Sequence, residues 1–310
     1  MSERALARLS GRAVLRLRGQ DVTEFLQGLV TVDLRLLTLE RSLWGALLTP
    51  QGRYLCDFFL IQEAADCVLL DCEMQQAPAL MQRLTFYRLR RKIDIVDATA
   101  EWAVVAIAAA PADLGLTSAQ GATRRLLAAI VFIDPRLVAL GARALVPPAT
   151  VDAFAASLKA QMVPARQFVE RRLALGVPEG ATDLIPERSL PLECNFAELG
   201  GVSFTKGCFV GQEVTARMHF RARPRRRLLP VRIEGNGVEA GAEVRTADGR
   251  EAGILQRVEG ELGLALLRIE HLFRPEAQPF VAGGARILWW LPDWLPIQEK
   301  KPLQTPETEP

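Results

Sequence analysis

The chain has few of the residues on which most metal sites and hydrolase active sites depend. Among its 310 residues are only two histidines, His219 and His271, and five cysteines. An odd number of widely separated cysteines does not make a disulfide framework, and neither histidine has metal-ligand spacing to a cysteine. We therefore expect no metal site. The cysteines are Cys56, Cys67, Cys72, Cys194 and Cys208.

Several common signatures are also missing. There is no G-x-G-x-x-G after a strand, no P-loop, no G-x-S-x-G and no H-E-x-x-H, which weakens the dehydrogenase, kinase and hydrolase interpretations. The net charge of +2 gives the whole molecule no strong preference for nucleic acid or membrane. The first residues contain no apolar run long enough for a signal peptide or a membrane span, and we expect a soluble, cytoplasmic protein.

What is present indicates a mixed α+β fold. Alternating or apolar runs predict strands, the second and third of which form a hairpin around T-P-Q-G. Asp21 and Glu24 have capping-box spacing before the first helix, and Pro78 fits the first turn of the second. Strands are expected at 13–19, 42–48, 53–61, 67–72, 92–98, 101–109 and 142–148, helices at 22–30, 74–91, 150–163 and 164–177, and irregular chain at 110–125 and 177–205.

After Arg227 the pattern changes to short strands separated by glycines, with an Asp248-Gly249 hairpin signal. This is typical of a small β-barrel. We expect an α+β region over 1–225 built from two pseudo-repeated modules, a barrel domain over 226–297 and a mobile polar tail over 298–310.

One segment, F-T-K-G-C-F-V-G-Q-E-V-T-A-R-M beginning at Phe204, concentrates unusual chemistry. We expect a helix beginning just after Gly207, with Cys208 in its first turn and beside Lys206. The unpaired backbone N–H groups at the start of that helix and the Lys206 ammonium would both favour the thiolate form of Cys208. The alternative is that Cys208 simply packs under the loop. Gly207 and Gly211 allow close approach of a ligand or of a neighbouring helix.

The expected helix carries Gln212 and Glu213, whose amide and carboxylate could read the edge of a heteroaromatic ring. They could equally form a solvated helix face, with Glu213 paired to Arg217 four residues later. An arginine run then admits three interpretations: an anionic small molecule, RNA phosphates, or a solvated linker. It comprises Arg217, Arg221, Arg223, Arg225, Arg226 and Arg227.

The block K-G-C-F-V-G-Q-E closely resembles the signature of the YgfZ-type folate-binding proteins, whose eukaryotic relatives mature [4Fe–4S] proteins in mitochondria. The segments F-L-Q-G-L-V-T-V-D-L, with Asp33, and L-T-P-Q-G-R-Y-L-C-D-F-F-L are similar to two further family segments. The resemblance implies the fold of the glycine-cleavage T-protein: a ring of ferredoxin-like α+β modules followed by a barrel, with tetrahydrofolate in a central channel.

That resemblance also assigns roles. It implies an accessory protein for assembly or repair of iron–sulfur clusters that meets its client or assembly partners transiently, with Cys208 as the functional thiol and Lys206 beside it. The folate contacts it implies are Asp33, Arg172, Gln212, Glu213 and Arg217. Nucleic acid and membrane are not expected partners.

The alternative is a folate-dependent aminomethyltransferase, which needs a positioned proton-transfer group. Here Asp71-Cys72 aligns with the T-protein's Asn-Ala, and Pro78 falls where its catalytic aspartate would be. The T-protein's R-L-E-A-G arginine corresponds to Arg172, with Ala174 in place of the glutamate. The resemblance therefore favours folate binding without aminomethyl transfer, and whether the protein is an enzyme stays open.

Overall fold

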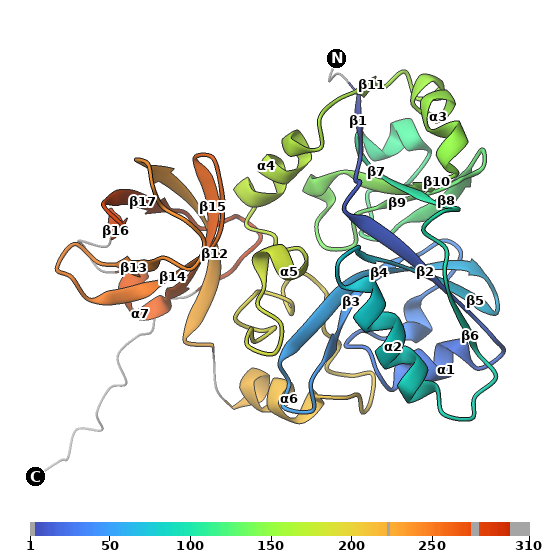
Figure 1. Cartoon of the computed structure of the whole chain (residues 1–310), viewed down its shortest axis with the longest axis horizontal. Helices are drawn as coiled ribbons and strands as arrows, with labels where there is room; N and C mark the ends of the chain where they lie inside the picture. The colour runs from blue at the N-terminus through green and yellow to red at the C-terminus, as the bar shows by residue number, and fades with distance from the viewer. Residues whose placement is uncertain (1–3, 222–223, 274–278, 298–310) are drawn as a thin grey trace, which may run out of the picture.

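The computed structural model describes residues 4–221, 224–273 and 279–297. Three β-sheets organise these residues, and Figure 1 shows the barrel beside the two open sheets. No helix in this part of the chain is long and apolar enough to cross a membrane. The expected tail over 298–310 lies outside the described residues.

The first open sheet has five antiparallel strands in the order β3-β4-β5-β2-β6, and its hairpin around T-P-Q-G is confirmed. Helices α1 and α2 cover one face, where their apolar residues pack on the sheet. The strands are β2 Arg12–Arg18, β3 Leu43–Leu48, β4 Tyr54–Ala64, β5 Cys67–Glu73 and β6 Asp94–Asp97; the helices are α1 Val22–Gln27, the 3₁₀ turn η1 Leu34–Leu36 and α2 Ala77–Arg88.

The second open sheet has the strand order β11-β1-β7-β10-β9-β8, with β1 and β11 parallel and the other pairs antiparallel. The elements are β1 Ala5–Arg8, β7 Ala103–Ala108, η2 Pro111–Leu114, β8 Thr123–Leu126, β9 Ala129–Ile133, η3 Val138–Leu140, β10 Ala142–Val146, η4 Pro148–Thr150, α3 Val151–Ser157 and β11 Gln161–Met162.

The closed barrel contains β12 to β17, and the Asp248-Gly249 hairpin joins two antiparallel strands of it as expected. The expected combination of a mixed α+β region and a C-terminal barrel is confirmed. The strands are β12 Arg226–Glu234, β13 Glu243–Arg245, β14 Glu251–Glu259, β15 Leu262–Arg268, β16 Phe280–Ala282 and β17 Ala285–Trp289, with α7 Ile269–Leu272 following β15.

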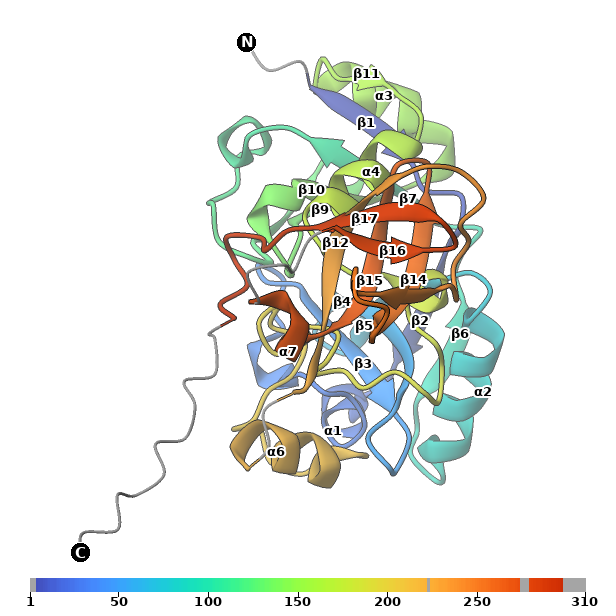
Figure 2. The same cartoon turned by 90° about the vertical axis from the view of Figure 1, so that its left-hand side faces the viewer.

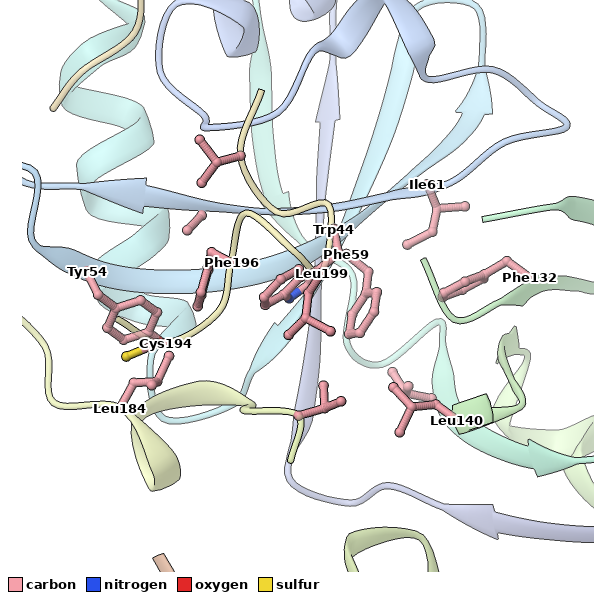
Figure 3. Close-up of a cluster of buried hydrophobic side chains, with 14 of the residues drawn as sticks. Trp44, Tyr54, Phe59, Ile61, Phe132, Leu140, Leu184, Cys194, Phe196 and Leu199 are labelled. Carbon is pink, nitrogen blue, oxygen red and sulfur yellow. The ribbon is translucent and has the colours of Figure 1, made fainter. Parts of the chain in front are cut away.

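The chain between the sheets and the barrel contains α4 Arg166–Ala174, α5 Gly180–Asp183 and α6 Gln212–Phe220. The stretch between α5 and α6 is mostly turns, as expected, and its middle, residues 189–203, is mostly buried. Phe196 packs with ring centroids 4.4 Å from Trp44, in a core that also includes residues of both open sheets and the barrel (Figure 3). This buried connector fastens the three sheets together.

Some element boundaries were predicted wrongly. Asp21 precedes α1 but its side chain makes no capping hydrogen bond, and the helix ends at Gln27 rather than residue 30. The interval expected to be irregular chain ends in β8, and the fully buried β9 was missed. β9 has the sequence A-I-V-F-I, whose branched and aromatic residues favour a strand, so the signal for it was present in the sequence.

Candidate functional site

The loop that carries Cys208 is held on one side by the segment after α1. The backbone N–H of Ser203 donates to the Thr31 carbonyl at 2.9 Å, and that of Val210 donates to the Gly28 carbonyl at 3.3 Å. Two of the segments singled out in the sequence, some 180 residues apart, therefore meet as one unit (Figure 2 shows α1 next to α6).

Lys206 is the main fastener of this loop. Its Nζ donates to the carbonyl oxygens of Val30 and Val32, at 2.5 and 2.7 Å. Burial lowers the pKa of Lys206 to about 8, and the neighbouring Asp33 carboxylate opposes that shift. With a pKa near 8 the ammonium form still dominates at neutral pH, so both carbonyls have a charged donor. Lys206 thus anchors the loop, a role that the sequence did not predict, and its effect on the Cys208 thiol stays a prediction.

Asp33 and Gln27 complete this support. Asp33 accepts hydrogen bonds from Arg35 and from the Gln27 amide, and the bonds from Arg35 hold the pKa of Asp33 well below its usual value. The Gln27 side chain also donates to the Lys206 carbonyl at 3.4 Å and accepts from the backbone of Leu34. Asp33 therefore belongs to the loop's foundation, and Gln27, which sequence reasoning missed, bridges the two segments.

On its other side the loop presses against the tip of the β3–β4 hairpin. Gly211 has φ +83°, and a Cβ there would lie 2.5 Å from the Thr49 carbonyl oxygen. A Cβ on Gly52 of the hairpin would lie 3.0 Å from the Gly211 carbonyl oxygen. Both glycines are required because two backbones touch here. The sequence predicted that a ligand or a neighbouring helix would approach the backbone at Gly211. In the structure the segment that approaches it is the β3–β4 hairpin.

Cys208 is exposed, whereas Cys56, Cys67, Cys72 and Cys194 are buried. The helix begins at Gln212, four residues after Cys208. The expectation that the thiol sits in the first helical turn is wrong, because Gly211 adopts the left-handed conformation and the helix begins only after it. Cys194 is one of the buried cysteines, and burial raises the pKa of its thiol to about 12.

The side chains of α6 point largely to solvent. Glu213 and Arg217 are exposed, Gln212 is half-buried, and no ion pair joins Glu213 to Arg217 within the described ranges, contrary to the expected pairing. The far end of α6 carries aromatic contacts, with the His219 ring stacked on Phe204 at 3.7 Å between centroids.

The arginine run is divided by the fold. Arg226 pairs with Glu193 at 3.0 Å and Arg227 with Glu198 at 2.6 Å, so both fasten β12 to the buried connector. Arg217, Arg221 and Arg225 are exposed, and Arg223 lies outside the described residues. Arg226 and Arg227 therefore act within the protein, and for the exposed Arg217, Arg221 and Arg225 the ligand, RNA and linker interpretations stay predictions.

Arg172 lies elsewhere, in a buried cluster of charges between the two open sheets and the barrel. It donates to the Val177 carbonyl at 2.6 Å and forms an ion pair with Asp183. Figures 1 and 2 place α4, which carries Arg172, well away from α6. The structure therefore separates Arg172 from the other implied folate contacts, Gln212, Glu213 and Arg217.

The same cluster contains three further arginines around Glu179. Arg136 lies 3.0 Å and Arg12 3.3 Å from its carboxylate, and Arg143 also pairs with it. Burial alone would raise the pKa of Glu179, but the field of the arginines outweighs burial and holds it well below its usual value. The guanidinium groups of Arg12, Arg136 and Arg143 also lie over the ring of Phe59, the last at 4.2 Å.

Two aspartates singled out in the sequence are also explained by this region. Asp71 is fully buried and pairs with Arg12 at 2.6 Å and Arg143 at 3.4 Å. Asp57, in the hairpin segment, accepts from the Trp44 indole, the Tyr54 hydroxyl and the backbone of Gly180. Both carboxylates thus have several donors, and they fasten strands together.

The space left in this central region is small. The cavity lined by Asp134, Arg136, Arg143, Arg172 and Glu179 measures about 50 Å³. Ligand pockets generally span about 300–1,000 Å³. Most charged groups of the cluster pair with one another, although Asp183 Oδ1 has no hydrogen-bond partner among the described residues, and this cavity is too small for a pterin. The described part of the chain also contains no group of three or more histidine, cysteine or acidic side chains that could hold a metal ion.

The barrel and nearly the whole chain are similar to known proteins. Residues 225–297 match the C-terminal β-barrel domain described for CAF17. The chain is 37% identical to the human mitochondrial iron–sulfur cluster assembly factor IBA57, over 96% of this chain and 86% of that protein. It is 31% identical to the Mycosarcoma maydis homologue, over 78% and 60% respectively.

The fold itself is similar to the aminomethyltransferase T of the glycine cleavage system from Bartonella henselae. The TM-score is 0.74 at 16% identity, covering 93% of this chain and 84% of that one. The expected T-protein-like fold is confirmed. The expectation of a cytoplasmic protein is wrong by the same comparisons, because the similar assembly factors are named as mitochondrial proteins.

Proposed function

The chain belongs to the family of IBA57 iron–sulfur cluster assembly factors, and from this premise we propose that Cys208 is the residue through which it meets a cluster. The observation that carries the proposal is accessibility. Of the five cysteines, Cys208 alone is exposed, on a loop fastened by Lys206 beneath it. A thiolate at this position can enter a cluster's coordination without any rearrangement of the core.

A single thiol cannot hold a cluster, since iron–sulfur clusters take about four protein ligands. The described residues contain no group of three or more histidine, cysteine or acidic side chains that could complete the coordination. The cluster is therefore cargo that Cys208 shares with a client or an assembly partner. In that exchange the Cys208 thiol loses its proton, its sulfur forms one Fe–S bond, and a ligand already on that iron departs, so no electrons are transferred.

The test is restoration of [4Fe–4S] enzyme activity in a strain deleted for this protein. Cys208→Ser is expected to reduce restoration at least about tenfold relative to the wild-type chain, since the hydroxyl is a far poorer iron ligand. The matched control is Thr205→Ala, at an exposed position in the same loop, which should restore activity fully. Full restoration by Cys208→Ser would remove the thiol from the function.

We further propose that tetrahydrofolate is the small molecule this chain binds. The support is the motif resemblance, together with the suitability of buried arginines for folate carboxylates. Because the central cavity is about 50 Å³, binding requires the arginines to exchange Glu179 for the ligand's carboxylates. Arg136, Arg143 and Arg172 are placed for that exchange, since all three line this cavity together with Glu179.

Calorimetric titration with tetrahydrofolate tests this finer proposal. Glu179→Gln should bind more tightly than the wild-type chain, because the competing carboxylate is gone. Glu213→Gln, on the exposed face of α6, separates the two places implied for folate: it should leave the affinity unchanged if the ligand enters the arginine cluster. Absence of saturable binding to both the wild-type chain and Glu179→Gln would refute the folate proposal without touching the role of Cys208.

A further inference from the structure

The C-terminal end of α2 exposes two large apolar side chains. Phe86 is 74% and Leu89 is 83% exposed. Leu89 also has φ +52° and ψ −117°, a backbone conformation that normally requires glycine. A strained backbone at a non-glycine residue costs folding free energy, and an exposed side chain does not offset that cost by burial. Such residues concentrate at functional positions.

The same end of α2 is strongly basic. Residues 77–93 contain no acidic side chain and five cations. Arg91 pairs with Glu24, and Arg88 turns back to the Ile93 carbonyl. Arg90 and Lys92 are exposed and make no ion pair among the described residues. We use the name α2 tip for the surface formed by Phe86, Leu89, Arg90 and Lys92.

The α2 tip and the Cys208 loop are both attached to the same short helix. Glu24 of α1 pairs with Arg91 at 3.1 Å, next to the α2 tip. At the other end of α1, Gln27 and Gly28 hydrogen-bond the Cys208 loop. A helix of six residues is about 9 Å long. Figures 1 and 2 show α1, α2 and α6 at the same end of the molecule.

We propose that the α2 tip is the docking surface for an acidic protein partner that inserts an apolar side chain against Phe86 and Leu89. This inference rests on the proposed function, since the partner would be the one that shares a cluster with Cys208 across α1. Exposed cations beside large apolar side chains match a partner of opposite charge with an apolar anchor.

A protein fits this surface better than an anionic membrane or RNA. Asp94 and Asp97 are exposed on β6, which follows the α2 tip directly. A broad anionic surface approaching the tip would meet these two carboxylates, and like charges repel. A protein partner can place acids against Arg90 and Lys92 and avoid Asp94 and Asp97.

The probe is a helical peptide of about four turns with leucines on one face and glutamates on the other, measured by fluorescence anisotropy with the full chain. Its twin carries lysine in place of every glutamate. We expect the acidic peptide to bind at least about tenfold more tightly than the twin. Phe86→Ser with Leu89→Ser should remove that binding, as should Arg90→Glu with Lys92→Glu. Equal binding of the twin, or unchanged binding by both variants, would overturn the proposal.

Vesicles with phosphatidylglycerol and a uridine oligonucleotide serve as the competing probes. If either binds more tightly than the acidic peptide and loses binding in the same variants, the tip is a membrane or RNA surface and the proposal is wrong. Matched control substitutions at exposed Gln82 and Thr85, in the preceding turns of α2, should change no affinity.

The functional readout separates this inference from the proposed function. Cys208→Ser should bind the peptide as the wild-type chain does, while failing to restore [4Fe–4S] enzyme activity. The Phe86→Ser, Leu89→Ser double variant should fail in both assays. If Cys208→Ser restores activity, the proposed function fails, and the peptide result still decides the docking surface. If the double variant restores activity fully, the α2 tip is not the site at which the partner docks.

Discussion

The central charge cluster and the Cys208 loop both depend on buried cations, but these cations serve opposite purposes. In the cluster, Arg136 and Arg172 are buried and each is paired with carboxylates inside the protein. In the loop, one buried cation, Lys206, is paired only with carbonyl oxygens, and the thiol it supports is open to solvent. The arginines of the cluster are engaged by the protein's own carboxylates, whereas the Cys208 thiol is accessible to another molecule.

The comparison also separates stability from function. Buried ion pairs add little net stability over apolar packing, but removing one partner leaves a buried uncompensated charge. The cluster should therefore be intolerant of change whatever its role in binding. The loop has few buried charges at risk, so changes there should report on function more directly.

The largest expected effect is at Glu179, whose carboxylate faces four arginines. Glu179→Gln should lower the free energy of unfolding by about 3–5 kcal/mol, because it leaves buried guanidinium groups without their shared anion. Urea denaturation at neutral pH measures this. Glu213→Gln on α6 is the control and should stay within about 0.5 kcal/mol. Equal stability of the two variants would break the distinction between the regions.

Gly211 is the most sensitive position near the loop. Gly211→Ala should destabilise the protein by about 2–3 kcal/mol, because the new Cβ meets the Thr49 carbonyl and alanine disfavours φ +83°. The control is Gly207→Ala in the same loop. Gly207 also has a positive φ, but a Cβ there meets nothing within 4 Å, so its cost should be only about 1 kcal/mol. Thermal unfolding of both variants compares the two, and a cost at Gly207 equal to that at Gly211 would refute the hairpin contact.

The pH dependence of stability gives a second, smaller signature of the cluster. The pKa of Glu179 is depressed in the folded state, so its stabilising contribution is present above its unfolded pKa of about 4.3 and is lost as pH falls toward the folded value. The stability gap between the wild-type chain and Glu179→Gln should thus narrow below about pH 4.3, by at most about 1.4 kcal/mol per pH unit. A gap that is constant from pH 7 to 3 would contradict the assignment.

The smallest expected effect is at the thiol itself. Cys208→Ser should change the free energy of unfolding by less than about 0.5 kcal/mol, because the side chain is exposed. Cys194→Ser should cost about 1–3 kcal/mol, since it places a more polar hydroxyl at a buried position of the hydrophobic core. Chemical denaturation of the pair tests this. A large loss at Cys208 would mean that the loop depends on the thiol for its structure.

The sequence singled out the Cys208 loop but did not describe its structure. Residue types drew attention to the block from Lys206 to Glu213, and the role proposed for it came from the resemblance. The start of α6 could not be predicted, because a glycine is compatible with a helix and its left-handed conformation is imposed by the hairpin tip. Nor could the role of Lys206, whose partners Val30 and Val32 contribute only backbone carbonyls.

The charge cluster shows the same limit more strongly. Arg12, Arg143 and Glu179 stand in unremarkable surroundings, and each would pass as a surface residue. No local pattern records that strands from both open sheets and the connector point them at one another. Arg172 was singled out only through a resemblance, and the structure then placed it away from the residues expected to share its ligand.

The sequence by itself determined the α+β region, the barrel and the absence of a disulfide framework, because periodicity and composition act over a few neighbouring residues. Tertiary structure alone decided which charges are buried, which glycines are obligatory and which helix end is left open. Those outcomes depend on contacts between segments that are far apart in the chain, and the free energy of such a contact belongs to both partners.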